Sequence, residues 1–169
     1  MYPEFQPTGS CFVAGTKILM ADKSEKNIED VKRNDLVFTY NISKKRIEIA
    51  IVEEVTSPIH EEFIEVIFEN GIKNTNTLDH PYYVKNKGWC SYKPDLTSKN
   101  YGLDVKNLSV DDIVLVYDKF KDSIYEQNIT SIEEIHKKMK SYNLFKVNKN
   151  HNFFANGVLV HNKYNSKKN

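Results

Sequence analysis

The stretch IEDVKRNDLVFTYN at residues 28–41 has a counterpart later in the chain, VKNLSVDDIVLVYD at residues 105–118. The two align without a gap at a spacing of 77 residues (105 minus 28), and their apolar positions, one Asp and one Tyr coincide. Asn34 and Asp111 stand where each turn favours a left-handed backbone, which Asn and Asp tolerate better than most residues. This internal repeat predicts a duplicated β-fold with pseudo-two-fold symmetry. The alternative is two short turn-to-strand units that share only their turn chemistry.

Around these stretches, short runs rich in Val, Ile, Tyr and Phe are separated by Asn, Asp, Lys and Ser, which is typical of β-strands. The best helix candidate is Ser131–Met139, where Ile132 and Ile135 are three residues apart. We therefore expect an all-β domain with at most one or two short helices. The expected strands cover residues 17–20, 36–40, 46–51, 63–68 and 113–117.

The composition limits the classes of function. A chain of 169 residues has room for one ordinary domain, and a hydrophobic content of 40% suffices for a core. Because 24 basic residues balance 23 acidic ones, we expect no nucleic acid or anionic membrane as a partner recognised by bulk charge. No membrane span or signal peptide is recognisable in the sequence. We expect a soluble monomer, and the sequence leaves its compartment open.

The segment HNFFANGVLVHN at residues 151–162 predicts a tight hairpin, because Asn-Gly between two apolar runs is the preferred two-residue turn. Counting outward from this turn places His151 opposite Asn162, with His161 next to it. Directly opposed side chains share one face of the sheet. The alternative is that these histidines are exposed polar residues on an edge hairpin.

Such a cluster fits cleavage of the chain by itself. The side-chain amide of Asn162 can attack its own main-chain carbonyl, form a succinimide and release the amine of Lys163. A histidine can polarise that carbonyl or protonate the departing nitrogen. Holding these groups in place supplies the proximity advantage of an intramolecular reaction.

At the other end of the chain, the thiol of Cys11 is equally placed to attack the carbonyl of Ser10 and form a thioester. This step is uphill for a relaxed amide, so the protein must strain or polarise the Ser10–Cys11 bond. Thr77 and His80 are candidate helpers that could bind the amide as charge develops. The alternatives are that Cys11 is a small buried hydrophobe and that Thr77 is satisfied within a turn.

Together these segments resemble one family, the Hint domains, which comprise inteins, Hedgehog autoprocessing domains and bacterial intein-like domains. The matching blocks are CFVAGTKI at residues 11–18, IEDVKRNDLV at 28–37, TLDHPYYV at 77–84 and the segment 142–162. Gly88-Trp89 and residues 108–116 also resemble the family pattern. The resemblance implies an all-β horseshoe fold with pseudo-two-fold symmetry, and self-catalysed rearrangement of peptide bonds.

The resemblance also implies roles for individual residues. The implied catalytic residues are Cys11 as nucleophile, Thr77 and His80 as activators of the Ser10–Cys11 bond, and Asn162 with His161 and His151 for cyclisation. It implies a flank at 1–10, a domain at 11–162 and a flank at 163–169. The only expected partners are these flanking polypeptides, and no cofactor or metal is expected. Residues 117–140 are too few for the homing endonuclease that larger inteins carry, so no DNA cleavage is expected.

Two positions depart from splicing inteins. Lys163 stands where a Cys, Ser or Thr acceptor would be needed, an arrangement that resembles A-type bacterial intein-like domains. Asn143 stands where many inteins carry an acid that coordinates the steps, and it is a further candidate for assistance. We therefore expect hydrolysis at both junctions. Splicing without the usual acceptor would need the freed amine of Lys163 to attack the Ser10 thioester.

Other interpretations remain open. The chain could be a degenerate Hint scaffold that binds or spaces its neighbours, or a thiol protease that uses Cys11 on a separate substrate. A zinc site lacks any Cys-x-x-Cys spacing, although zinc could inhibit by capturing the Cys11 thiolate. We expect Cys90 to pack beside Trp89, with a disulfide to Cys11 as the alternative. His60 and His136 belong to no motif and are expected at the surface.

Overall fold

The computed structural model describes residues 10–162, so the expected flank 163–169 and residues 1–9 of the other flank lie outside the described range. Within this range the chain forms fourteen strands, one α-helix and one short 3-10 helix. The elements are β1 (Phe12–Val13), β2 (Lys17–Leu19), β3 (Glu25–Asn27), η1 (Ile28–Asp30), β4 (Leu36–Asn41), β5 (Arg46–Thr56), β6 (Ile59–Phe68), β7 (Lys73–Thr77), β8 (Tyr82–Val84), β9 (Gly88–Ser91), α1 (Pro94–Tyr101), β10 (Lys106–Asn107), β11 (Ile113–Asp118), β12 (Ser123–Val147), β13 (Asn152–Ala155) and β14 (Val158–His161).

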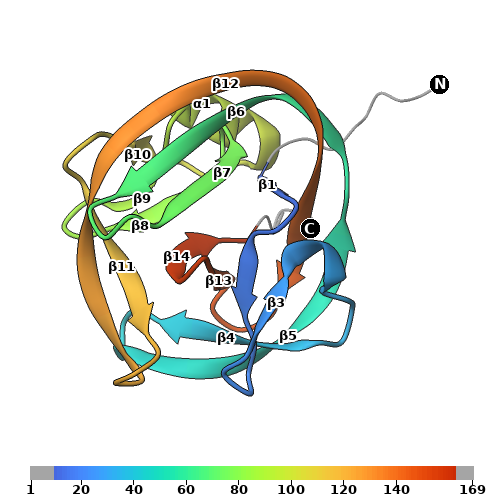
Figure 1. Cartoon of the computed structure of the whole chain (residues 1–169), viewed down its shortest axis with the longest axis vertical. Coiled ribbons are helices and arrows are strands. Elements are labelled where there is room, and N and C mark those ends of the chain that lie inside the picture. The colour runs from blue at the N-terminus through green and yellow to red at the C-terminus, as the bar shows by residue number, and fades with distance from the viewer. Residues whose placement is uncertain (1–9, 163–169) are drawn as a thin grey trace.

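All the strands belong to one continuous, strongly curved sheet of 14 strands. Figure 1 shows β12 as a long band around the outside of the molecule, with the β13–β14 hairpin inside the curve. Strand β12 is 25 residues long and pairs in turn with β11, β6, β1 and β5. The expected all-β fold is therefore confirmed. In residues 10–162 no helix has both the length and the apolar character needed to cross a membrane.

The duplication expected from the sequence is visible in the backbone hydrogen bonds. Asn34 donates its N–H to the carbonyl of Val52 at 2.7 Å, and Asp111 donates its N–H to the carbonyl of Ile129 at 2.8 Å. Donors and acceptors are both 77 residues apart (111 minus 34 and 129 minus 52). Asn34 and Asp111 have φ angles of 77° and 79°, as the turn chemistry predicted. These bonds confirm the pseudo-two-fold symmetry.

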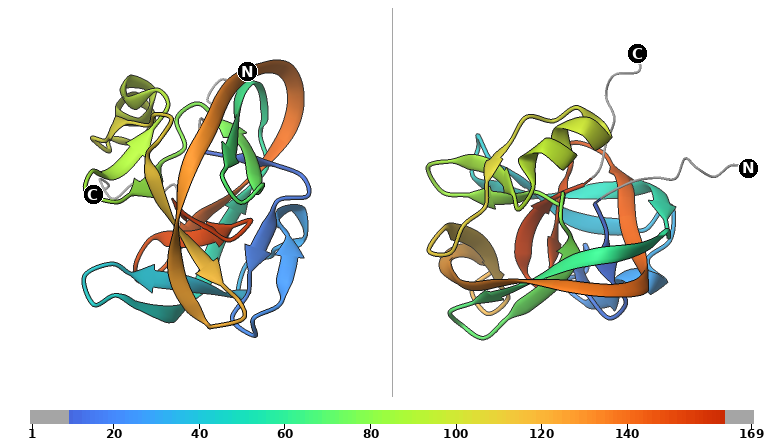
Figure 2. Two further views of the ribbon diagram at one scale, coloured as in Figure 1. Left: turned by 60° about the vertical axis from the view of Figure 1, so that its left-hand side comes forward. Right: turned by 90° about the horizontal axis from the view of Figure 1, so that it is seen from above.

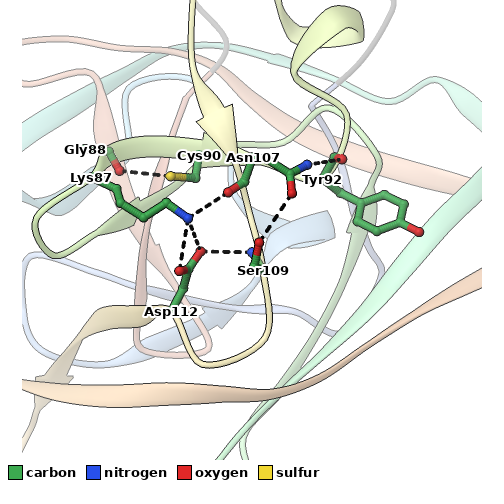
Figure 3. A network of polar contacts seen from close by, with 7 residues as sticks. All are labelled: Lys87, Gly88, Cys90, Tyr92, Asn107, Ser109 and Asp112. Atoms are coloured by element: carbon green, nitrogen blue, oxygen red, sulfur yellow. Dashed lines mark hydrogen bonds and ion pairs between the residues drawn. The ribbon is translucent and has the colours of Figure 1, made fainter.

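One aspartate in each half forms an ion pair with a lysine. The carboxylate of Asp35 accepts the Nζ of Lys26 at 2.9 Å, and that of Asp112 accepts the Nζ of Lys87 at 3.0 Å. In the second half this ion pair is part of a wider network, in which Lys87 also donates to the carbonyl of Asn107 at 2.9 Å (Figure 3). The network ties the turn before β9 to the segment between β10 and β11. These contacts thus link the two segments between which α1 lies in the sequence.

The five expected strands are confirmed as β2, β4, β5, β6 and β11. The hairpin register is confirmed as well, because Ala155 pairs with Val158 and Asn152 pairs with His161. Seven of the eight residues in β13 and β14 are buried. Both faces of this hairpin pack inside the molecule, which explains why its strands are continuous apolar runs without alternation.

The helix predicted at Ser131–Met139 is wrong, because this segment lies within β12. Ile132 pairs with Val66, and Ile135 pairs with Phe63 on β6. The register shifts between Ile129 and Ser131 and between His136 and Met139. These irregularities break the two-residue alternation of a strand, and pairing along β6 outweighs the weak local helical spacing.

The one α-helix, α1, was not predicted from the sequence. Pro94 occupies its first turn, and Gly102 ends it with a φ of 68°, a left-handed conformation that favours glycine. Figure 2 shows α1 outside the curved sheet, beside the segment that carries β8 and β9. The helix is short and largely polar, and of its residues only Thr97 and Tyr101 are buried. Its position therefore depends on the contacts of these two side chains.

Candidate active site

The bond between Ser10 and Cys11 is buried and held by Thr77 at the end of β7. Ser10 is 0% exposed and Cys11 is 1% exposed. Cys11 donates its N–H to the Oγ1 of Thr77 at 2.9 Å, and Thr77 donates its own N–H to the carbonyl of Cys11 at 2.9 Å. Thr77 therefore contacts the amide nitrogen that would leave if the Ser10–Cys11 bond broke.

Asp79 extends this arrangement, and the sequence analysis did not single it out. Its Oδ1 accepts the hydroxyl of Thr77 at 2.9 Å and the N–H of Ser10 at 2.9 Å. Its Oδ2 accepts the side-chain amide of Asn100 at 2.7 Å. One buried carboxylate thus orients the residue before the bond and the hydroxyl beside it. The only signal in the sequence was its position between Thr77 and His80.

His80 lies fully buried, edge-on to aromatic rings of the core. Its ring is 4.3 Å from that of Phe12 and 6.4 Å from that of Phe153, measured between centroids. Neither ring nitrogen makes a hydrogen bond within the described residues. Burial is the main cause that lowers the pKa of His80 to about 3. The nearby His161 acts in the same direction, and backbone groups of His161 and Ser10 act in the opposite one. His80 is therefore a neutral imidazole at neutral pH, close to the backbone of both Ser10 and His161.

Asn162 is fully buried at the end of the central hairpin. Its backbone N–H donates to the carbonyl of His151 at 3.1 Å, so these two residues lie opposite each other. Its side-chain Nδ2 donates to the carbonyl of Phe145 on β12 at 3.1 Å. The Oδ1 atom has no hydrogen-bond partner among residues 10–162. The side-chain nitrogen is thus fixed in direction.

His161 contacts the group on which Asn162 would react. Its Nδ1 makes a short hydrogen bond to the main-chain carbonyl oxygen of Asn162. A carbonyl has no hydrogen to donate, so Nδ1 carries the hydrogen of the neutral ring. The indole ring of Trp89 lies 4.8 Å away, edge-on. Burial lowers the pKa of His161 to about 4, with His151 as a smaller cause in the same direction.

The ring of His151 contacts the last residue of β12. Its Nδ1 lies 3.0 Å from the carbonyl oxygen of Val147, so Nδ1 carries a hydrogen and donates it to this oxygen. His151 has a φ of 54°, a left-handed backbone that is unfavourable for a residue with a Cβ. The structure thus pairs His151 with Asn162 through the backbone, while its ring is oriented by Val147.

Asn143 lies on β12 near both ends of the domain. Phe12 pairs with Tyr142 and Val13 with Ser141, and the next residue along β12, Asn143, pairs with Thr56 on β5. Asn143 is 2% exposed, and its Oδ1 has no hydrogen-bond partner among residues 10–162. The structure therefore places this candidate next to the Phe12–Tyr142 pair, which follows the first junction.

The other residues considered from the sequence are Cys90, His60 and His136. Cys90 forms no disulfide with Cys11, and burial raises the pKa of its thiol. His136 is exposed and bonds Glu134 at 3.1 Å, whereas His60 is partly buried against Phe63. Among residues 10–162, no three His, Cys, Asp or Glu side chains gather as metal ligands would. Lys163 lies outside the described residues.

Solved structures share this fold. The DnaB intein from Synechocystis sp. PCC 6803 aligns with a TM-score of 0.73 at 21% identity, covering 90% of this chain and 97% of the intein. The bacterial intein-like domain from Clostridium thermocellum aligns with a TM-score of 0.70 at 28% identity, covering 92% of this chain and 100% of that domain. The curved sheet, its internal symmetry and the central hairpin thus define a domain with the Hint fold of inteins.

The sequence comparison identifies a particular family that the sequence analysis did not indicate. The model of the AXH family, described as the Ataxin-1 and HBP1 module, matches residues 12–119, and the chain belongs to this family. HMG box-containing protein 1 of Rattus norvegicus is 26% identical over an alignment of 123 residues, and the match covers 62% of this chain and 24% of that protein. The chain thus spans about a quarter of the length of the first relatives that it matches.

The family match includes some residues of the candidate site and leaves out others. Residues 12–119 include Thr77, Asp79 and His80. They begin one residue after Cys11 and end before the hairpin that carries Asn162. The AXH match therefore covers the residues that hold the first junction, without its thiol and without the second junction.

Proposed function

We propose that this domain cleaves two peptide bonds of its own chain, Ser10–Cys11 and Asn162–Lys163. The observation that carries the proposal is the convergence of both junctions on residues 77–81. Thr77 binds the amide of Cys11, and the carbonyl of Pro81 accepts the N–H of His161 at 3.0 Å. Residues 77–81 thus contact the backbone at both junctions, which supports a reaction of the Cys11 thiol at one bond and of the Asn162 amide at the other.

At the first junction, the Cys11 sulfur attacks the carbonyl carbon of Ser10. The new C–S bond replaces the C–N bond, and the proton lost by the thiol ends on the freed nitrogen of Cys11. Thr77 and Asp79 hold the geometry of the amide, and the neutral ring of His80 can accept one proton and donate another. The product is a thioester, which water then hydrolyses.

At the second junction, Nδ2 of Asn162 attacks the carbonyl carbon of the same residue. A succinimide forms, the bond to Lys163 breaks, and the amide proton is transferred to the departing nitrogen. The Nδ1–H of His161 already contacts the carbonyl oxygen on which negative charge would develop. A donor fixed in this position stabilises that charge without reorganisation.

The two cleavages proceed independently in this proposal, as in an A-type bacterial intein-like domain. The 28% identity to the Clostridium thermocellum domain supports the comparison with bacterial intein-like domains in general. Lys163 has no side-chain hydroxyl or thiol to which the acyl group of the thioester could be transferred in the usual way. The reacting partners are the flanks 1–10 and 163–169, and the domain acts once, in cis, as a monomer. Ligation of Ser10 to the freed amine of Lys163 is a minor route.

The test is to express the chain between two distinguishable folded proteins and to follow all product masses over time. We expect separate N-terminal and C-terminal cleavage products at rates that do not change on dilution. Cys11→Ala should stop only the first cleavage, and Asn162→Ala only the second. An intact precursor in all three cases would contradict the proposal, and cleavage of a separate peptide would indicate a protease acting in trans.

A second candidate function is that of a binding module without peptide-bond chemistry. The family match favours it, because residues 12–119 exclude both Cys11 and Asn162. In that case the parent chain and both variants would remain intact in the same experiment. The same set of masses therefore distinguishes the two functions.

A further inference from the structure

The side chain of Ser10 occupies an enclosed polar site, although this residue belongs to the flank and not to the domain. Ser10 is 0% exposed, and its Oγ lies 2.6 Å from the phenolic oxygen of Tyr101. Tyr101 is the last residue of α1 and is itself 6% exposed. A residue before a scissile bond needs no side-chain contact for the chemistry described above, so this contact calls for an explanation.

The direction of the hydrogen bond follows from counting hydrogens. Tyr101 has one hydroxyl hydrogen, which it donates to the carbonyl of Asp79 at 3.1 Å. The hydrogen between the two hydroxyls must therefore come from Ser10. Burial raises the pKa of Tyr101 well above its usual value, so the phenol remains neutral. Residue 10 consequently has to be a hydrogen-bond donor.

The backbone of Ser10 is held by the same helix end. Its N–H donates to Oδ1 of Asp79, whose Oδ2 accepts the side chain of Asn100, the neighbour of Tyr101. Ser10 has a φ of 54°, which is unfavourable for a residue with a Cβ. Without these contacts the strained backbone would relax, and the Ser10 carbonyl would no longer be presented to Cys11.

We propose that Tyr101 is a specificity-determining residue, and that it selects a small hydroxyl-bearing residue, here Ser10, immediately before the reactive cysteine. This inference rests on the proposed function, and it restricts which residue types can precede the bond that is cleaved at the first junction. Because Ser10 has no exposed surface, a larger side chain would have to displace the residues that enclose it. An alanine fits, but it removes the hydrogen that Ser10 donates to the phenolic oxygen of Tyr101. Losing a hydrogen bond to a buried acceptor, where water cannot replace it, costs free energy.

The test is a double-mutant cycle on the rate of the first cleavage, induced with excess thiol so that each thioester is trapped. The four precursors carry the parent sequence, Ser10→Ala, Tyr101→Phe and both substitutions together. We expect each single substitution to slow the reaction about tenfold, and the double variant to be no slower than the slower single variant. Tyr92→Phe is the matched control, because the Tyr92 hydroxyl bonds Glu134 near the surface, and its rate should equal that of the parent.

Cleavage at Asn162–Lys163 is measured in the same samples and reports on folding. Its rate should be unchanged in all precursors, whereas a variant that merely misfolds would lose both cleavages. Ser10→Ala leaves the domain itself intact, so it tests the inference even if Tyr101→Phe folds poorly. Rates within twofold of the parent, or additive losses in the double variant, would overturn the inference alone. A parent chain that cleaves at neither junction would overturn the proposed function, and this inference with it.

Discussion

The imidazole of His161 contacts, through Nδ1, the main-chain carbonyl oxygen of Asn162. Asn162 in turn directs its side-chain nitrogen toward the carbonyl of Phe145. These two contacts place a hydrogen-bond donor on the oxygen of the carbonyl that the asparagine would attack. The relationship concerns two neighbouring residues, yet it depends on the fold. Pro81 accepts the backbone N–H of His161, Trp89 packs against the His161 ring, and Phe145 on β12 accepts the side-chain amide of Asn162.

Replacing His161 should slow the second cleavage selectively. We expect His161→Ala to reduce the rate at Asn162–Lys163 about 100-fold, because it removes the donor from the developing oxyanion. Thioester formation at Cys11 should change far less. The measurement is the mass of each product over time, with His136→Ala as the control, since His136 is exposed and distant from both junctions in the sheet. An unchanged rate in His161→Ala would show that His161 does not assist cyclisation.

Acidification should destabilise the fold through its buried histidines. Burial lowers the pKa of His80 to about 3 and that of His161 to about 4, whereas both titrate near 6.5 when unfolded. The unfolded chain therefore binds more protons below pH 6.5, and stability is lost as the pH falls from 6.5 toward 4. Each histidine should contribute roughly 1.4 kcal/mol per pH unit in this window.

This pH dependence is measured by urea unfolding between pH 4 and 7, on the unreactive chain that carries Cys11→Ala and Asn162→Ala. In His161→Gln the slope should fall by the contribution of one histidine. In His136→Gln, which alters an exposed histidine, the slope should match that of the parent. Equal slopes in all three chains would mean that His161 is protonated in the folded state.

Removing the carboxylate of Asp79 should affect the first junction. Asp79→Asn places an amide where two donors converge on Oδ1 and a third on Oδ2. We expect thioester formation to slow at least tenfold and the free energy of unfolding to fall by about 1–3 kcal/mol. Asp95→Asn, in the exposed first turn of α1, is the control. If Asp79→Asn forms the thioester at the parent rate, the carboxylate does not orient this bond.

The two left-handed turn residues should behave alike. Asn34 and Asp111 have nearly equal φ angles of 77° and 79°. Replacing either by alanine should lower the free energy of unfolding by about 1 kcal/mol, because alanine tolerates this conformation less well. The glycine variants should have a higher free energy of unfolding than the alanine variants, since glycine adopts positive φ readily. Chemical denaturation measures both pairs, and alanine variants as stable as the glycine variants would refute this account.

Local sequence patterns predicted much of the fold. The Asn-Gly turn was sufficient for the register of β13 and β14, because a two-residue loop leaves one way to pair the strands. The spacing of 77 residues between the two similar stretches was sufficient for the symmetry. In contrast, the spacing of Ile132 and Ile135 suggested a helix, and only their pairing with β6 identifies a strand.

The candidate site was predicted in part. The residue types Cys, Thr, His and Asn were recognisable because each has a definite chemistry. Asp79 and Tyr101 were missed, because an aspartate in a turn and a tyrosine at a helix end are ordinary locally. Their roles arise from contacts across 69 and 91 residues of chain to Ser10, which no local pattern records.

The amino-acid sequence by itself determined the strands, the two repeated turns and the presence of a reactive group at each end of the domain. These depend on neighbouring residues, through backbone preference and covalent reach. Only the tertiary structure decided which groups meet. It brought Cys11 to Thr77, His161 to Pro81, and Ser10 to the end of α1. The reason is physical: such contacts form when the curved sheet closes, and burial then keeps His80 and His161 neutral at pH values where an exposed histidine would be protonated.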